Sequence, residues 1–229
     1  MKNDIISANI EAYEKKYFEG YGTIYPEGHI IRFLKRFLEY EFKLQQKVLL
    51  DFGCGNGTHT KYFHSRGFNS FGFDSNKMSI ESAKKRFPQI QENFKVHNAG
   101  NSILNLFPGI KFSVVIANQV LYYLDDETLN NRLSDIEKLL DKDGYVYFTM
   151  MGRQNHYYSI STPINKDNQN LRSVTFNHRL NETTIINFIN DEDHLKSKFG
   201  MFEPVFTGFY DCTSKFGSHF HFQFIGKKK

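Results

Sequence analysis

The chain has 229 residues, of which 40% are hydrophobic and 24% are charged, and its formal net charge is +4. These values are ordinary for a globular protein and leave room for one α/β domain with small additions. They give little support to nucleic-acid binding, no stretch reaches the ~20 apolar residues of a membrane span, and the two cysteines make no disulfide framework. Because residues 1–16 also lack a signal-peptide pattern, we expect a cytoplasmic protein with neither nucleic acid nor a membrane as its partner.

Two amphipathic helices are predicted before the first strand. Residues 4–18 and 29–40 place apolar side chains at helical spacing, and the glycines and Pro26 of residues 20–29 mark a loop between them. This loop is rich in tyrosine. Arg32 follows it, and its guanidinium either belongs to a solvated helix face or binds an anion.

The most informative stretch is residues 47–60, KVLLDFGCGNGTHT. Its apolar run, Val48–Leu50, is typical of a strand buried on both faces of a parallel sheet, and the run ends at Asp51. Three alternating glycines then allow the backbone to approach a ligand closely, and Thr58 is a suitable N-cap for a helix. The stretch therefore predicts a strand, a glycine-rich turn and a helix, at the sheet edge where ligands bind.

A second acidic residue strengthens this interpretation. Residues 69–74, NSFGFD, form another short apolar segment that ends in Asp74, where a carboxylate can accept hydrogen bonds from the two hydroxyls of a ribose. The glycine spacing differs from the G-x-G-x-x-G of dinucleotide-binding proteins, because Thr58 stands where the last glycine is needed. Asp51 would also repel a pyrophosphate, whereas it suits a ligand with an ammonium group. For the glycine pattern alone, a tight turn without any ligand is the alternative.

The central part of the chain continues as alternating strands and helices. Strands are predicted at residues 93–97, 112–117 and 144–150, and helices at residues 78–87, 104–107 and 128–140, the last preceded by acidic capping residues at 125–127. This alternation favours a parallel sheet with helices on both faces. Asn118 follows the strand at 112–117, so its amide either meets a ligand or stabilises a turn.

The alternation stops after Met150. Residues 152–180 are polar and irregular, which in a compact domain often marks a lid or a binding segment. Residues 182–189 are predicted to form a helix, and residues 203–210 and 219–225 are predicted to form two strands. In the second of these strands Phe220, Phe222 and Phe224 alternate with polar residues.

Residues 51–57, DFGCGNG, together with Asp74 resemble the first motifs of the class I S-adenosylmethionine-dependent methyltransferases. Gly100-Asn101-Ser102 resembles the family's Gly-Asp-Ala at the adenine, and residues 112–124, FSVVIANQVLYYL, resemble its fourth strand and the following turn. The resemblance covers residues 40–150, with Asn101 and Ser113 in places where the family commonly has acids. It implies a Rossmann-like, seven-stranded, mostly parallel sheet with helices on both faces and an antiparallel C-terminal hairpin.

The resemblance also implies a single domain, residues 1–229, that binds S-adenosyl-L-methionine. We expect a helical lid at 1–40, a cofactor-binding core at 41–150, a substrate-binding insertion at 151–181, and a C-terminal helix and hairpin at 182–229. The expected cofactor-binding residues are Tyr21, Asp51, Gly53, Cys54, Gly55, Asp74, Ser75, Asn101, Ser102 and Asn118. No metal site is expected, and the expected substrate-binding residues are Tyr25, Arg32, Tyr122, Arg153, Tyr157 and Arg179.

Transfer of a sulfonium methyl group requires an oriented nucleophile and, for a hydroxyl, a group that accepts its proton. His156, which follows the fifth strand, and His178 are the candidate bases, each with a structural role as the alternative. Arg153 and Arg179 favour an anionic acceptor, so we expect O-methylation of a small polar molecule such as a sugar, a phosphate-bearing or a nucleotide-linked metabolite. The alternatives are an N-methyltransferase, a protein methyltransferase, a nicotinamide oxidoreductase and a silent S-adenosylmethionine-binding protein. The oligomeric state is left open.

Overall fold

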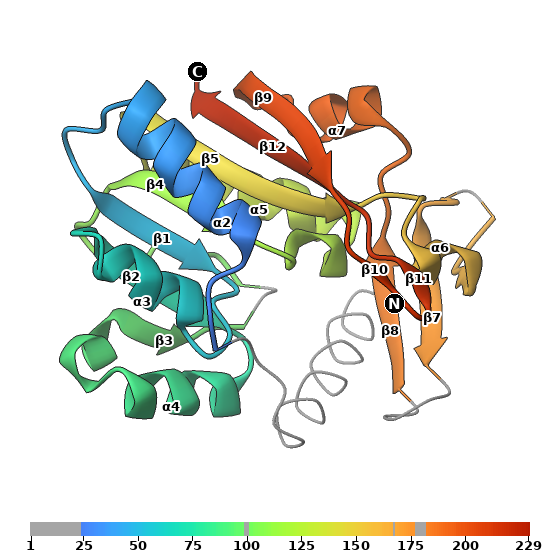
Figure 1. The fold of residues 1–229 in the computed structure, drawn as a ribbon, viewed down its shortest axis with the longest axis horizontal. Coiled ribbons are helices and arrows are strands. Elements are labelled where there is room, and N and C mark those ends of the chain that lie inside the picture. Colours follow the sequence, from blue (N-terminus) through green and yellow to red (C-terminus); the bar gives the residue numbers. More distant parts are fainter. Residues whose placement is uncertain (1–23, 99–100, 167, 177–181) are drawn as a thin grey trace.

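The computed structural model describes residues 24–98, 101–166, 168–176 and 182–229. Its centre is a seven-stranded sheet in the order β3-β2-β1-β4-β5-β12-β9 (Figure 1). Strands β1 to β5 pair in parallel, and β12 runs antiparallel to both of its neighbours, β5 and β9. The predicted Rossmann-like sheet with an antiparallel C-terminal pair is therefore confirmed. The strands are β1 Val48–Phe52, β2 Asn69–Asp74, β3 Phe94–Val96, β4 Phe112–Ala117, β5 Leu140–Met151, β9 Phe202–Tyr210 and β12 His221–Lys228.

Helices cover both faces of this sheet (Figure 1). On one face, buried side chains such as Ile30 and Phe33 pack with Val114 and Tyr147 of the sheet. On the other face, the core is larger and rich in phenylalanine, and it includes Leu133. The helices are α2 Gly28–Arg32 with its π-helical continuation η1 Phe33–Glu41, α3 Thr58–His64, α4 Lys77–Arg86, η2 Pro88–Asn93, η3 Leu121–Tyr123, α5 Asp126–Leu139, α6 His156–Ser159 and α7 Glu192–Lys198.

The order of the strands creates a switch point between β1 and β4. From β1 the chain moves outward to β2 and β3, and it then returns to place β4 on the other side of β1. In open α/β sheets, ligands bind outside the carboxyl ends of the strands at such a point. The polar residues that follow β1, β2, β4 and β5 are therefore brought to one edge.

Most elements predicted for the central part of the chain are confirmed within a few residues. The side chain of Asp125 accepts the N–H of Thr128 at 2.7 Å, as expected of a capping residue. Two details were wrong. Thr58 is the first residue of α3 and not its cap, because Gly57, with a φ of 78°, precedes the helix. Residues 104–107 form turns and no helix.

The segment after β5 has more structure than the sequence predicted. It folds into α6 and a three-stranded antiparallel sheet made of β6 Ser161–Pro163, β7 Leu171–Phe176 and β8 Glu182–Asn187. The predicted helix at residues 182–189 is wrong, since this stretch is β8. Its run of two threonines and two isoleucines at 183–186 is β-branched, which favours a strand. The helix comes later, as α7, with Asp191 accepting the N–H of His194 at 2.8 Å.

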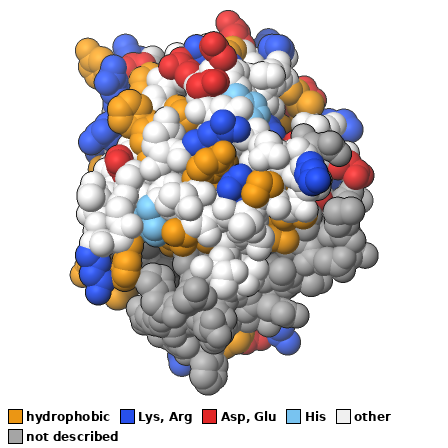
Figure 2. Space-filling view, turned by 90° about the vertical axis from the view of Figure 1, so that its right-hand side faces the viewer, with side chains coloured by type: hydrophobic (Ala, Val, Ile, Leu, Met, Phe, Trp, Pro, Cys, Tyr) orange, Lys and Arg blue, Asp and Glu red, His pale blue; other side chains and the backbone are white. Residues whose placement is uncertain are grey.

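The connection between β9 and β12 carries a short hairpin, β10 Thr213–Ser214 and β11 Gly217–Ser218. On the face that Figure 2 shows, Lys and Arg side chains lie in separate small groups among neutral and hydrophobic ones. Among the described residues, no helix is long and apolar enough to cross a membrane. The cytoplasmic location stays a prediction.

Candidate active site

The glycine-rich turn after β1 holds a conformation that other residues rarely adopt. Gly53, Gly55 and Gly57 have φ angles of 71°, 53° and 78°. The N–H of Gly53 donates to the carbonyl oxygen of Phe73 at 2.9 Å. A Cβ atom on Gly53 would lie 2.4 Å from Cγ2 of Val120. The turn thus connects the ends of β1, β2 and β4 and leaves no room for a larger residue at Gly53.

Asp74 ends β2 beside this turn. One carboxylate oxygen accepts the N–H of Gly55 at 2.9 Å, and the other accepts the N–H of Asn76 at 2.8 Å. Burial raises the pKa of Asp74, and these hydrogen bonds oppose the rise. Because each carboxylate oxygen has two lone pairs, Asp74 can accept further hydrogen bonds from a ligand.

Asp51, near the end of β1, is 2% exposed and accepts the hydroxyl of Thr60 at 2.7 Å. Burial raises the pKa of Asp51 to about 7, and the charge of Asp74 adds to the rise. We call Asp51 and Asp74 the carboxylate pair. No ion pair joins either of them to a Lys or Arg of the described residues. Buried carboxylates without a counterion fit a ligand that carries positive charge.

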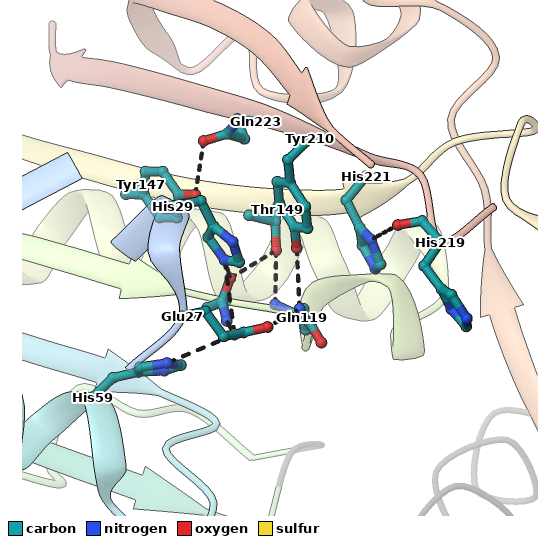
Figure 3. A network of polar contacts seen from close by, with 11 residues as sticks. Glu27, His29, His59, Gln119, Tyr147, Thr149, Tyr210, His219, His221 and Gln223 are labelled. Carbon is teal, nitrogen blue, oxygen red and sulfur yellow. Dashed lines mark hydrogen bonds and ion pairs between the residues drawn. The ribbon is translucent and has the colours of Figure 1, made fainter. Parts of the chain in front are cut away.

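A second group of polar residues, of which the sequence predicted only Asn118, surrounds Glu27 (Figure 3). The amide of Asn118 donates to one carboxylate oxygen of Glu27 at 2.7 Å, and the amide of Gln119 donates to the other at 2.8 Å. His29 Nε2 lies 2.8 Å from the Asn118 amide oxygen, and His59 Nε2 lies 3.6 Å from Glu27. The residue just before α2 is thereby connected to the ends of β4 and α3.

An aromatic row continues this group along the edge of the sheet. The ring of Tyr210 stacks on His29 at 3.9 Å and on His221 at 5.1 Å, with interplanar angles of 11° and 10°. Its hydroxyl accepts the amide N–H of Gln119 at 3.1 Å. Gln119 has a φ of 56°, a strained value for this residue type, and its backbone N–H donates to the Thr149 hydroxyl at 2.7 Å. We call the whole group the histidine cluster, made of Glu27, His29, His59, Asn118, Gln119, Thr149, Tyr210 and His221.

The imidazoles of the histidine cluster are neutral at pH 7. Burial lowers the pKa of His59 and of His221 to about 4 each, and it lowers the pKa of His29 although Glu27 acts in the opposite direction. Burial also raises the pKa of the Tyr210 hydroxyl. Among the described residues, no group of three or more His, Cys, Asp or Glu could hold a metal ion.

Several of the expected cofactor-binding residues lie together around the turn. Asp51, Gly53, Cys54, Gly55, Asp74 and Ser75 form its two sides, and Asn118 lies in the adjacent histidine cluster. Asn101 and Ser102 are exposed. The carbonyl of Asn101 accepts a hydrogen bond from Arg132, and the hydroxyl of Ser102 accepts the N–H of Leu104 at 3.4 Å. Tyr21 lies outside the described residues.

The expected catalytic and substrate-binding residues are more dispersed. Arg153 is exposed, and its guanidinium donates to Asn170 at 2.9 Å and lies over the ring of Tyr158. Tyr25 is 80% exposed, and Arg32 is an exposed residue at the end of α2. His178 and Arg179 lie outside the described residues. Three others gather near the β10–β11 hairpin and His221, namely His156, Tyr157 and Tyr122.

One sequence signal could have pointed to His221. It alternates with Phe220, Phe222 and Phe224, so it faces the opposite side of β12. Because β12 is antiparallel to β5, its first residue pairs with Met151 at the carboxyl end of β5. Glu27 and Tyr210 carry no comparable signal, since each lies at an element end without a motif around it.

A comparison with models of protein families shows the family of this chain. The model of a family described as "Methyltransferase domain" matches residues 24–199, which is more than half of the chain. The chain belongs to this family. It is therefore a methyltransferase, and the cofactor of the family is S-adenosylmethionine.

Solved structures share the fold of this methyltransferase. An S-adenosylmethionine-dependent methyltransferase from Anabaena variabilis is 19% identical, with a TM-score of 0.68, over 98% of this chain and 95% of that one. One from Methanosarcina mazei is 18% identical, with a TM-score of 0.67, over 90% of this chain and 99% of that one. Magnesium protoporphyrin IX methyltransferase from Synechocystis, with bound S-adenosylhomocysteine, is 15% identical, with a TM-score of 0.66, over 100% of this chain and 99% of that one. No curated protein sequence matches the chain.

Proposed function

We propose that this methyltransferase binds S-adenosylmethionine across the carboxyl ends of β1, β2 and β4 and methylates a hydroxyl group of a small polar acceptor. When bound, S-adenosylmethionine supplies an electrophilic methyl group on a positively charged sulfur. Asp74 would accept hydrogen bonds from the ribose hydroxyls, because its oxygens keep unused lone pairs. Asp51 would favour the positive charge of the ligand, because its own carboxylate is buried without a counterion.

The observation that carries the choice of a hydroxyl acceptor is the uncharged side of the histidine cluster. Tyr210, Thr149 and His221 lie side by side next to Gln119, and their polar atoms belong to hydroxyls and a neutral imidazole (Figure 3). Hydroxyl groups can orient an acceptor oxygen by hydrogen bonds, and a neutral imidazole can take its proton as the oxygen gains the methyl group. These uncharged groups would bind a positively charged acceptor less well.

Glu27 favours N-methylation as a second candidate. Its carboxylate lies between His29 and His59 and is the one acidic group of the histidine cluster. The amides of Asn118 and Gln119 already donate to both of its oxygens, and the imidazoles of His29 and His59 lie beside it. We rank this candidate second because these four side chains already surround Glu27, although each of its oxygens keeps a further lone pair.

The class of acceptor remains our prediction from the sequence, a sugar, a phosphate-bearing or a nucleotide-linked metabolite. Arg153 gives it less support than expected, since Asn170 and Tyr158 already engage its guanidinium. Arg32 remains a predicted anion-binding residue, because it is exposed at the end of α2, the helix that also carries His29. We also propose a cytoplasmic enzyme whose partner is this small molecule, without nucleic acid or a membrane.

Two measurements test the proposal. Calorimetric titration with S-adenosylhomocysteine, with NAD as the control, is expected to show binding of the first compound alone. Tritiated S-adenosylmethionine is then offered with matched hydroxyl and amine probes, such as glucose 1-phosphate against glucosamine 1-phosphate, and UDP-glucose against UDP-glucosamine. Label on the hydroxyl members supports the proposal. Label on the amine members alone would replace it with N-methylation, and cofactor binding without any label transfer would favour a silent binding protein.

A further inference from the structure

His221 occupies a defined place at the edge of the sheet. It is the first residue of β12, where it pairs with Met151 on one side and with Tyr210 on the other. Its ring stacks on Tyr210 at 5.1 Å and lies 5.7 Å from the ring of Tyr122. Figure 3 shows its side chain pointing the same way as those of Tyr210 and Thr149, toward the side where Gln119 lies. Neighbouring strands and rings therefore fix the orientation of the imidazole.

The hydrogen bond of His221 determines which ring nitrogen carries the proton. Its Nδ1 lies 2.8 Å from the carbonyl oxygen of His219. A carbonyl oxygen only accepts hydrogen bonds, so Nδ1 is the protonated nitrogen and Nε2 carries the lone pair. Burial keeps the ring neutral by lowering its pKa to about 4, with the charges of His29, Glu27 and the His219 side chain as smaller influences.

The lone pair on Nε2 is buried and unused. His221 is 5% exposed, and among the described residues its Nε2 has no hydrogen-bond partner. His29 Nε2 lies within hydrogen-bond distance of Asn118. His59 Nε2 also has no hydrogen-bond partner in the described part of the chain, but it lies 3.6 Å from a carboxylate oxygen of Glu27, an acceptor that favours a protonated nitrogen there. Because a buried acceptor without a donor is unfavourable, its presence in a polar cluster points to a ligand that supplies the donor.

We propose that His221 is the catalytic base of the reaction, taking the proton of the acceptor hydroxyl on its Nε2. This inference rests on the proposed O-methylation. As the acceptor oxygen forms its bond to the methyl carbon, the carbon–sulfur bond breaks and its electron pair stays on sulfur. The O–H proton passes to Nε2, the carbonyl of His219 stabilises the imidazolium through Nδ1, and the proton leaves to water after the product. His221 thus replaces His156 and His178 as our candidate base.

The first test reads the tautomer without any methyl transfer. In protein labelled with ¹⁵N-histidine and saturated with S-adenosylhomocysteine, we expect His221 to show a protonated Nδ1 and an unprotonated Nε2 from pH 8 down to about pH 5. The variant His221→Asn identifies the resonance. A protonated Nε2 at pH 7 would overturn the inference, whatever the activity of the enzyme.

The second test compares two matched variants in the tritium assay with the hydroxyl probes. His221→Asn keeps an amide donor for the His219 carbonyl but has no base, and we expect its turnover to fall by ~10²–10⁴-fold with unchanged affinity for S-adenosylhomocysteine. His64→Asn removes an imidazole at the C-terminal end of α3, outside the histidine cluster, and it should keep its turnover. Added imidazole should partly rescue His221→Asn alone.

The two proposals fail in different ways. Equal turnover of wild type and His221→Asn would overturn the role of His221 while leaving O-methylation intact. Wild type that binds S-adenosylhomocysteine but labels only the amine probes would overturn O-methylation and, with it, the need for this base. If His221→Asn does not fold, as judged by thermal unfolding, His221→Gln takes its place, because it also lacks a basic nitrogen.

Discussion

The carboxylate pair and the histidine cluster lie at the same edge of one sheet, but burial acts on them in opposite ways. In Asp51 burial disfavours the anion and raises the pKa to about 7, so the ionised carboxylate is unfavourable until a positively charged ligand binds beside it. In His59 and His221 burial disfavours the cation, so both rings are neutral and able to accept protons. One physical cause thus prepares one region for a charged cofactor and the other for proton transfer.

The largest effect should follow from filling the turn that holds the carboxylate pair. Gly53→Ala places a Cβ atom 2.4 Å from Val120 at a φ of 71°, so we expect the free energy of unfolding to fall by ~2–4 kcal/mol. Gly67→Ala is the matched control. It has a φ of 84° with nothing within 4 Å of the added atom, and it should cost ~1 kcal/mol. Equal losses in urea unfolding would show that the contact with Val120 does not matter.

Removing one member of the carboxylate pair should weaken cofactor binding. Asp74→Ala removes the carboxylate that would accept hydrogen bonds from the two ribose hydroxyls. Each of these bonds is worth ~1.5 kcal/mol, so we expect the affinity for S-adenosylhomocysteine to fall by ~100-fold. Asp191→Ala, which removes an aspartate that caps α7, should leave the affinity unchanged. Calorimetry of both variants measures the difference, and unchanged binding in Asp74→Ala would remove Asp74 from the site.

The histidine cluster should make the protein sensitive to acid. The pKa of His59 is about 4 in the folded protein and 6.5 ordinarily, so between these pH values the unfolded chain binds more protons and stability falls as the pH is lowered. Relative to His59→Gln, wild type should lose ~3 kcal/mol between pH 7 and pH 4. Urea unfolding at a series of pH values gives both curves. A constant difference between them would mean that His59 titrates normally.

The carboxylate pair should respond in the opposite direction. The pKa of Asp51 is raised from 3.8 to about 7, so its contribution to stability is present at low pH and is lost as the pH rises through 7. Asp51→Asn keeps an acceptor for Thr60 without the charge, and we expect it to be more stable than wild type by a few kcal/mol at pH 8 but not at pH 4. The same variant should bind S-adenosylhomocysteine more weakly. A variant that is less stable at pH 8 would contradict this account.

The carboxylate pair could be predicted from the sequence because its determinants are local. Asp51 and the glycines lie in one turn, and Asp74 ends the next strand, so a strand–turn–helix pattern is enough to bring them together. The same reasoning predicted the parallel sheet, whose strands and helices alternate with clear periods. It failed at residues 182–189, because the β-branched residues 183–186 favour a strand, and residues 182–187 pair with β7.

The histidine cluster could not be predicted because tertiary structure assembles it. Glu27 precedes a helix, Tyr210 ends the edge strand β9 and His221 begins the adjacent strand β12, and no sequence motif connects them. Their proximity depends on where α2 packs and on the antiparallel direction of β12, and both are set by contacts across the whole sheet. His156 was a reasonable choice of base by position, but its Nδ1 lies 3.4 Å from the carbonyl oxygen of Ser218, whereas Nε2 of His221 is buried without a hydrogen-bond partner among the described residues.

The place of β12 between β5 and β9 has a consequence for folding kinetics. Strand β9 joins the sheet only through β12, so β9 and β12 dock on the parallel strands only when β12 pairs with β5, which is far from it in the chain. Pairing of segments that are distant along the chain is slow. We therefore expect a refolding phase in which amides of β1 and β2 are already protected from hydrogen exchange while those of β9 are not. A molecule at that stage would bind S-adenosylmethionine at β1 and β2 before the proposed base, His221, is in place.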